Sequence, residues 1–318
     1  MIETHGLTKQ FGEFVAVNDI NLNVAAGQVF AVLGPNGAGK TTTVRMLTSI
    51  LKPTAGTARV AGFDVVRQST QVRAAVGVLT EQHGLYERMR ALEYLEFFGR
   101  VYSLSTDETR KRGLALMDRF GLTDALTKRL GEYSKGMKQK LALVRAMLHD
   151  PQVLLLDEPT SAMDPQSAKQ VREAITDLRK DSRTVVLTTH NLTEAQLLAD
   201  SIGVIRRGRM IASGSFEELA QRFVGDPVMH LALGSAINGT ASLIGELAQI
   251  TEEGPDWLRY RTPTPTQTNP AVIKRLVEHG ASVVSLSPLQ MNLEDVYLNI
   301  VEEDEVAHGH PMKGAKSS

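Results

Sequence analysis

The chain has 318 residues, of which 42% are hydrophobic and 22% are charged, and its formal net charge at pH 7 is -1. This length suggests about two domains and a large core, and the near-neutral charge gives no electrostatic reason to expect nucleic acid as a partner. The sequence contains no cysteine, which excludes disulfide frameworks and thiolate nucleophiles. Apolar runs fall short of the roughly 20 residues of a membrane helix, so we expect any membrane association to depend on another polypeptide.

The first motif along the chain follows the apolar run 28–33, which we expect to be a buried strand. It reads GPNGAGKTT and fits the phosphate-binding pattern G-x-x-x-x-G-K-S/T. Glycines at these positions let successive backbone N–H groups face the β- and γ-phosphates of a nucleoside triphosphate, and the next helix directs its positive dipole end at the same anion. The residues expected to bind the nucleotide here are Gly34, Asn36, Gly37, Ala38, Gly39, Lys40, Thr41 and Thr42.

Two side chains of this motif have separate roles. Lys40 adds a full positive charge that glycine amides cannot provide, and Thr41 supplies a hydroxyl suited to a magnesium ion between the two terminal phosphates. A chance glycine-rich turn is the alternative, but the helical spacing of Val44, Leu47 and Leu51 after the motif disfavours it. The sequence therefore predicts a nucleotide site that also binds magnesium.

Short apolar strands alternate with amphipathic helices in the N-terminal two thirds of the chain, which is the pattern of a mostly parallel sheet covered by helices. The strand at 153–156 ends in Asp157 and Glu158, and the strand at 184–188 ends close to His190. Because ligands bind at the carboxyl ends of strands in open α/β sheets, we expect these side chains and the phosphate loop to meet in one crevice. Between about residues 83 and 145 the periodicity becomes helical, which indicates a helical insertion.

A second candidate anion site lies in YSKGMKQKLALVRAM, residues 133–147, where Ser134 and Gly136 open a helix. Alone, this turn would be an ordinary helix N-cap. The order of phosphate loop, serine-glycine turn, VLLLDEPT segment and downstream histidine, however, resembles the ATP-binding subunits of ABC transporters. The turn is similar to their LSGGQ signature, with Lys135 and Met137 where the family often has Gly and Gln.

The resemblance implies an α/β fold of the P-loop NTPase class, with an ABC-type ATPase domain, a helical insertion, and ATP and Mg2+ as ligands. It implies that Ser134, Gly136 and Met137 contact the γ-phosphate held by an opposite subunit. It also implies that Asp157 orients the magnesium ion, while Glu158 positions or deprotonates the attacking water.

Two more roles come from the resemblance. His190 is similar to the family's switch histidine, which contacts the γ-phosphate and acts with Lys40 and Glu158 in catalysis. Asp164, in the segment 161–164, would link the sites of the two subunits. The alternatives are a structural histidine, an acidic pair that faces solvent at residues 157–158, and a turn that caps the following helix.

Two positions match the family less well. Phe11 lies where the family presents an aromatic ring to adenine, and an ordinary core phenylalanine is the alternative. In VLTEQHGLY the family normally has a glutamine as a magnesium and water ligand, whereas here Glu81 takes the aligned position with Gln82 beside it. Either oxygen can serve as a ligand, so both residues remain candidates.

The resemblance covers residues 1–222 and favours the ATPases of ABC-2 type exporters, including the drug-resistance and sodium-export groups, because of the GLYERM loop, the altered signature and a C-terminal extension. In that extension we expect a small α/β accessory domain at 227–303, with a loop TPTPTQT followed by a helix that starts at Asn269-Pro270. It shows no catalytic constellation, so subunit contact, regulation and a stabilising appendage all remain open. Residues 304–318 are polar and are expected to be disordered.

As a whole, the resemblance implies an ATP-hydrolysing subunit that dimerises with a second copy, or with a homologous subunit, and drives transport through integral membrane permease subunits, with export favoured. The chain would act at the cytoplasmic face of the membrane, with residues near Tyr86 and Met89 facing the permease. The alternative is a soluble ABC ATPase that acts on ribosomes or as a regulator. A DNA-repair ABC ATPase fits poorly, because the segment between Lys40 and Ser134 is too short for a long coiled coil.

Overall fold

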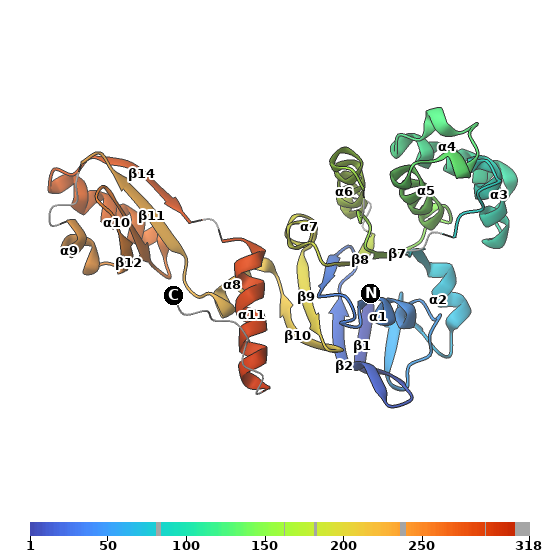
Figure 1. The fold of residues 1–318 in the computed structure, drawn as a ribbon, viewed down its shortest axis with the longest axis horizontal. Coiled ribbons are helices and arrows are strands. Elements are labelled where there is room, and N and C mark those ends of the chain that lie inside the picture. Colours follow the sequence, from blue (N-terminus) through green and yellow to red (C-terminus); the bar gives the residue numbers. More distant parts are fainter. Residues whose placement is uncertain (81–83, 162, 181–182, 236–239, 290, 309–318) are drawn as a thin grey trace. The chain divides into compact units, whose positions relative to one another are not determined.

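The computed structural model of the chain describes residues 1–80, 84–161, 163–180, 183–235, 240–289 and 291–308. The chain forms two compact units, Met1–Phe216 and Glu217–Ser318 (Figure 1). The division lies at the start of helix α8 (Phe216–Phe223), slightly before residue 222, where the sequence placed the end of the first domain. Within the described residues, every helix is too short or too polar to cross a membrane.

The first unit is built on a six-stranded sheet with the strand order β10-β9-β3-β8-β7-β6. Neighbouring strands from β9 to β6 pair in parallel, and β10 adds an antiparallel edge. The strands are β3 (Val29–Leu33), β6 (Val76–Leu79), β7 (Val153–Asp157), β8 (Thr184–Thr189), β9 (Ser201–Arg206) and β10 (Arg209–Gly214). β3, β7 and β8 are buried along their whole length, which explains why β3 and the first four residues of β7 are apolar rather than alternating; β8 combines Val and Leu with three threonines.

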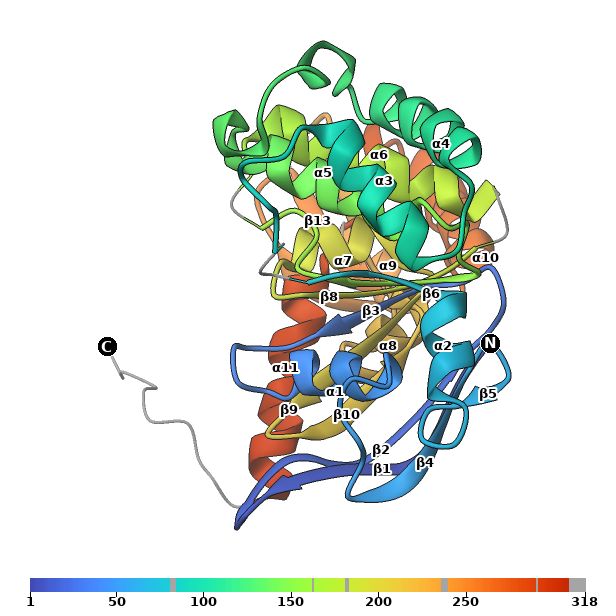
Figure 2. The same cartoon turned by 90° about the vertical axis from the view of Figure 1, so that its right-hand side faces the viewer.

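A second, antiparallel sheet of the first unit has the order β2-β1-β4-β5. Its strands are β1 (Ile2–Phe11), β2 (Phe14–Val24), β4 (Ala55–Val60) and β5 (Phe63–Asp64). Helix α1 (Lys40–Leu47) lies between the two sheets, as Figure 2 shows, and Val44 and Met46 join a core with residues of both sheets. This packing holds the phosphate-loop helix rigidly behind the loop.

Helices separate the parallel strands. α2 (Ser69–Ala75) precedes β6, while α6 (Pro165–Lys180) and α7 (Leu192–Leu198) follow β7 and β8. The predicted helical insertion lies between β6 and β7 and contains α3 (Ala91–Val101), α4 (Thr106–Arg119), η1 (Thr123–Ala125), η2 (Leu130–Glu132) and α5 (Lys135–Met147). α3, α4 and α5 stand together beyond the sheet in Figures 1 and 2. The predicted α/β fold with a parallel sheet and a helical insertion is confirmed.

The second unit contains an antiparallel sheet with the order β12-β13-β11-β14. Its elements are β11 (Val228–Leu233), α9 (Thr240–Gly245), β12 (Gln249–Glu253), β13 (Trp257–Arg261), α10 (Pro265–Glu278) and β14 (Val283–Pro288). Met229, Leu231 and Leu233 alternate with more exposed residues and share a core with Val272 and Leu276 of α10. The alternation follows from a sheet with one face covered.

Two helix boundaries of this unit differ from the sequence-based expectation. α10 begins at Pro265, inside the predicted TPTPTQT loop, because a proline in the first helical position loses no helix hydrogen bond. α11 (Leu293–Ala307) extends beyond residue 303 into the predicted tail. Asn292 caps its start, and His308 lies 3.2 Å from the carboxylate of Asp304 at its end. Residues 309–318 lie outside the described residues.

Candidate active site

A cavity of about 370 Å³ opens where the loop after β3 meets the ends of β7 and β8. Parallel neighbours end at the same edge of a sheet, so the motifs that follow these strands converge there. The cavity is lined by Phe14, Ala16, Pro35, Asn36, Gly37, Gly39, Lys40, Thr41, Thr42, Asp157, Glu158, Ser161 and His190. The structure thus brings together most of the phosphate-loop residues with both carboxylates and the histidine singled out in the sequence.

The loop itself requires glycine at two points of close approach. Gly39 has a φ of 109° and caps α1, and a Cβ there would lie 2.7 Å from the carbonyl oxygen of Ala16. A Cβ on Gly34 would lie 2.3 Å from the carbonyl oxygen of Ile205. Ala38 is buried behind the loop. The loop therefore folds tightly against β2 and β9, and its backbone faces the cavity.

Lys40 holds the charge at the centre of the site. Its side chain is only 6% exposed, and Nζ donates to the carbonyl oxygens of Gly34 at 2.6 Å and Pro35 at 3.3 Å. Nζ also lies 3.6 Å from Oε1 of Glu158. A buried cation surrounded by oxygen acceptors of its own loop is positioned to attract the anionic part of a ligand.

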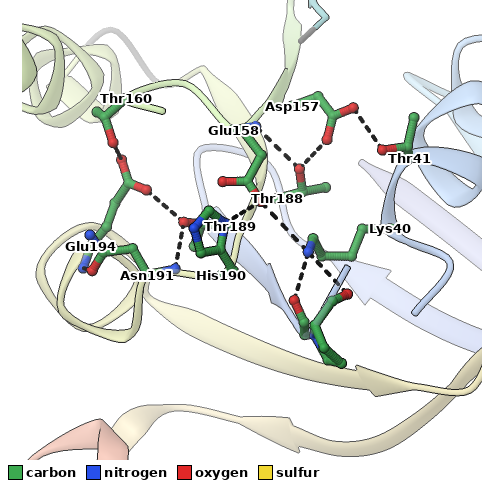
Figure 3. A network of polar contacts seen from close by, with 12 residues as sticks. Lys40, Thr41, Asp157, Glu158, Thr160, Thr188, Thr189, His190, Asn191 and Glu194 are labelled. Atoms are coloured by element: carbon green, nitrogen blue, oxygen red, sulfur yellow. Dashed lines mark hydrogen bonds and ion pairs between the residues drawn. The ribbon is translucent and has the colours of Figure 1, made fainter. Parts of the chain in front are cut away.

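Asp157 forms an oxygen cluster with two threonines, shown in Figure 3. Its buried carboxylate accepts a hydrogen bond of 2.9 Å from Thr41 Oγ1 and a second one from Thr188 Oγ1. Magnesium prefers oxygen ligands and is commonly held by one or two carboxylates together with substrate phosphates. The contact between Thr41 and Asp157 shows that a carboxylate and a hydroxyl share one small site, so these residues fit the ion.

Glu158 lies between the cation and the histidine. Its Oε1 is 2.9 Å from Nδ1 of His190, and its backbone has a φ of 51°, a left-handed conformation that is uncommon for a residue with a side chain. The backbone N–H of Glu158 donates to the carbonyl oxygen of Thr188 at 3.1 Å, which holds this turn against β8. Strained residues of this kind cluster at functional sites. The side chain of Glu158 is 14% exposed and that of His190 is 59% exposed, so the pair borders the open side of the cavity.

The Ser134 turn lies elsewhere on the first unit. Ser134 is exposed and caps α5, its hydroxyl accepting from the backbone N–H of Met137 at 3.2 Å. Gly136 packs against the start of α6, where an added Cβ would lie 3.3 Å from Ser167 Oγ and 3.8 Å from the carboxylate of Asp164. The Ser167 backbone N–H donates to Asp164 and is the main cause of the lowered pKa of that carboxyl. Ser134, Gly136, Met137 and Asp164 thus lie together at the starts of α5 and α6, with Ser134 exposed and Gly136 buried, and none of them lines the cavity.

Comparison with known proteins identifies the family in which these motifs occur together. A protein-family model described as ABC transporter matches residues 17–161. The chain is 40% identical over 225 residues to the ABC transporter ATP-binding protein NatA of Bacillus subtilis (strain 168), which covers 70% of this chain and 92% of NatA. It is 38% identical over 315 residues to the daunorubicin/doxorubicin resistance ATP-binding protein DrrA of Streptomyces peucetius, covering 98% of this chain and 93% of DrrA. The chain belongs to the ABC transporter ATP-binding proteins.

A solved structure agrees with this assignment. A dimeric ATP-binding cassette in a post-hydrolysis state, bound to ADP and Pi, is similar with a TM-score of 0.63 and 26% identity, over 68% of this chain and 98% of that chain. The chain is therefore an ATP-binding subunit, and its reaction is ATP hydrolysis coupled to transport.

The predicted adenine contact and the predicted glutamine-type magnesium ligand of the ABC ATPase need separate statements. Phe11 does not belong to the cavity lining, and Lys9 Nζ lies 5.1 Å above its ring. Phe14, its partner across the hairpin, lines the cavity instead, because it shares a strand face with Ala16. Sequence reasoning missed Phe14, although the hairpin contained a second aromatic residue. Glu81 and Gln82 lie outside the described residues.

Several polar residues that support the site were also missed. Gln139, buried in α5, donates from Nε2 to the carbonyl oxygens of Pro159 at 2.9 Å and Glu158 at 3.3 Å. It ties the signature helix to the turn after β7. Thr188 donates to Asp157, and Glu194 in α7 accepts from two threonine hydroxyls in the turns that carry Glu158 and His190. These partners lie far apart in sequence, so no local spacing indicates them. Only the pattern Asn-x-x-Glu at 191–194, typical of a helix start, could have singled out Glu194.

Proposed function

We propose that this ABC ATPase is the energy-supplying subunit of an exporter and works as a pair of copies that associate on ATP. Each nucleotide would bind between the phosphate loop of one copy and the Ser134 turn of the other. Hydrolysis would loosen the pair, and the cycle of association would drive permease subunits in the membrane, which hold the ATPase at the cytoplasmic face. Export is favoured because the relative DrrA carries the name of a drug-resistance protein.

The observation that carries this proposal is the separation of two anion-binding helix starts. The cavity contains the phosphate loop, Lys40 and Glu158, but the Ser134 turn is exposed outside it. One chain therefore surrounds a nucleotide on one side only. A dimer joined by two-fold symmetry would present the Ser134 turn of each copy to the cavity of the other and complete both sites at once. The dimeric cassette with ADP and Pi supports this arrangement.

Within the site, we assign each side chain a role from its surroundings. Lys40 would bind the terminal phosphates, and Glu158 would take a proton from the attacking water or orient it. His190, in contact with Glu158, would hold that carboxylate and contact the γ-phosphate. Thr41 and Asp157 would hold Mg2+, which supplies charge neutralisation on the phosphate oxygens when it is bound. Phe14, which lines the cavity, would offer adenine an aromatic surface in place of Phe11.

The permease contact is proposed at the helical insertion. Tyr86 is 50% exposed and packs edge-on against Tyr94 and Phe97 of α3. It lies at the start of the insertion, six residues after Thr80, which lines a small cavity together with Thr41 and Asp157, so a partner bound there would lie close in sequence to the proposed magnesium site. An exposed aromatic residue rigidly held by other rings is a favourable anchor for a protein partner.

The experiment that tests the function is ATP-dependent dimerisation of the variant E158Q. The amide cannot act as a base, so hydrolysis should fall about 1000-fold while ATP binding persists. Light scattering coupled to size exclusion should then show a dimer with ATP and a monomer with ADP. A wild-type chain that hydrolyses ATP at a rate independent of its own concentration, while E158Q stays monomeric in saturating ATP, would refute the paired mechanism. Recovery of the chain with ribosomes rather than with a membrane protein would refute the transport role.

A further inference from the structure

A single buried carboxylate connects the two catalytic turns of the site. Glu194 is 3% exposed and lies in the first turn of α7. Its Oε1 accepts a hydrogen bond of 2.6 Å from Thr160 Oγ1, and its Oε2 accepts one of 2.7 Å from Thr189 Oγ1. Each oxygen therefore binds a different segment of the chain, as Figure 3 shows.

The two threonines stand next to the residues that carry out hydrolysis. Thr160 follows Glu158 by two positions in the turn after β7, and Thr189 ends β8 directly before His190. Because Glu158 and His190 contact each other at 2.9 Å, a shift of either turn would change that distance. The carboxylate of Glu194 binds both turns and so links their positions.

Two further hydrogen bonds join the residues on either side of His190. The backbone N–H of Asn191 donates to Thr189 Oγ1 at 3.0 Å, and the side-chain oxygen of Asn191 accepts from the backbone N–H of Glu194 at 3.1 Å. The residues before and after His190 are thus hydrogen-bonded to one another. A buried carboxylate is costly unless its oxygens are satisfied, and here a threonine hydroxyl satisfies each of the two oxygens.

We propose that Glu194 is a positioning residue of the ATPase, which holds Glu158 and His190 in register for hydrolysis without touching the nucleotide. The inference depends on the catalytic roles proposed for those two residues. It differs from a purely structural role, because the loss should appear in the chemical step rather than in nucleotide binding. The ATP site itself is built from the phosphate loop, which Glu194 does not contact.

The first test compares E194A and E194Q in steady-state ATP hydrolysis. Misplacement of reacting groups by about 1 Å can cost about 100-fold. We expect E194A to lower kcat about 30-fold and to change KM less than about twofold, since binding is retained. The glutamine in E194Q can accept from Thr160 and donate to Thr189, so we expect it to stay within about threefold of wild type. The control T109V removes a buried threonine hydroxyl from α4, away from the site, and should leave both constants unchanged.

The second test uses single hydroxyls, which avoids a variant that fails to fold. T189V should lower kcat about tenfold in the wild-type background and have no further effect on the residual rate of H190A, because it acts through that histidine. An equal loss from T189V in both backgrounds would overturn the proposal. So would an E194A variant with the kcat of wild type in a protein that E158Q inactivates. If E158Q and H190A both hydrolyse ATP normally, the proposed site fails instead, and the two outcomes are distinct.

Discussion

The two helix starts that the sequence marks as anion sites differ in their surroundings. α1 begins at Lys40, which is buried among loop carbonyls beside Glu158. α5 begins at Lys135, which is exposed, after a Ser134 whose hydroxyl is used by its own helix as a cap. The same backbone feature thus borders a cavity in one place and is exposed on the surface in the other. Under the proposed pairing of two copies, the second start would act on a nucleotide held by the other copy.

The largest expected effect separates the two lysines that occupy the first position of these helices. K40A removes a buried cation from the cavity and should weaken ATP binding on the order of 100- to 1000-fold, as expected for truncation of a buried charged contact. K135A removes an exposed cation and should change binding to a single chain less than about twofold. Titration with a fluorescent ATP analogue at low protein concentration measures both. Equal losses in the two variants would show that the second start binds nucleotide within one chain.

The next effect concerns the cap of α5. S134A should lower hydrolysis about 30-fold, because the proposed pairing makes this hydroxyl a donor to the γ-phosphate held by the other copy, while ATP binding to the isolated chain is retained. It should also cost about 1 kcal/mol of stability through the lost N-cap.

The matched control for S134A is S105A, because Ser105 caps α4 in the same way and accepts from the backbone N–H of Glu108 at 3.2 Å. Both variants should melt at similarly lowered temperatures, but only S134A should lose hydrolysis and ATP-dependent dimerisation. An equal loss of hydrolysis in S105A would attribute the effect to stability alone.

A smaller effect is expected on the Mg2+ dependence of hydrolysis, which tests the proposed metal site beside the first helix start. T188V removes the hydroxyl that donates to Asp157 and should raise the Mg2+ concentration for half-maximal hydrolysis about tenfold, the usual scale for groups that orient a metal ligand. T184V is the control at the opposite end of the same strand, where the hydroxyl accepts from the backbone N–H of Gly27. If the Mg2+ dependence is unchanged in T188V, the proposal that Asp157 binds the metal is contradicted.

Much of the first helix start could be predicted from sequence because its determinants are local. The glycine pattern, Lys40 and Thr41 follow one another, and strand ends such as Asp157 meet the loop as a result of parallel pairing. The fold class follows from the same alternation of strands and helices. These features depend on spacing alone, which a single sequence contains.

The remaining features depend on side-chain direction and on long-range pairs. Whether Phe11 or Phe14 faces the cavity is decided by the strand that also presents Ala16. Glu194 contacts a threonine 34 positions earlier in the chain, a relation that has no spacing rule. The start of α10 at Pro265 was missed because prolines and threonines are read as a loop, although proline is tolerated in the first helical turn. Each of these features is decided by the tertiary structure.

The smallest predicted effect is a change in the pH dependence of stability. It tests whether the second helix start, at α5, depends on contacts of His149 that the first start does not use. His149 follows α5, stacks on Tyr102 with ring centroids 3.7 Å apart, and donates from Nε2 to the carbonyl oxygen of Val76 at 3.1 Å. It therefore joins the helical insertion to β6. Burial lowers the pKa of His149 from 6.5 to about 4.

The sign of the pH dependence follows from that shift. Between about pH 6.5 and 4 the unfolded chain binds a proton that the folded chain does not, so stability falls as the pH is lowered through this range. H149F keeps an aromatic ring but cannot titrate, so its melting temperature should fall less over the same range, by about 5 °C. Parallel pH curves for wild type and H149F would contradict the assignment. If acid also weakens the dimerisation of E158Q in ATP before it weakens ATP binding, the Ser134 turn depends on the contacts of His149 and the phosphate loop does not.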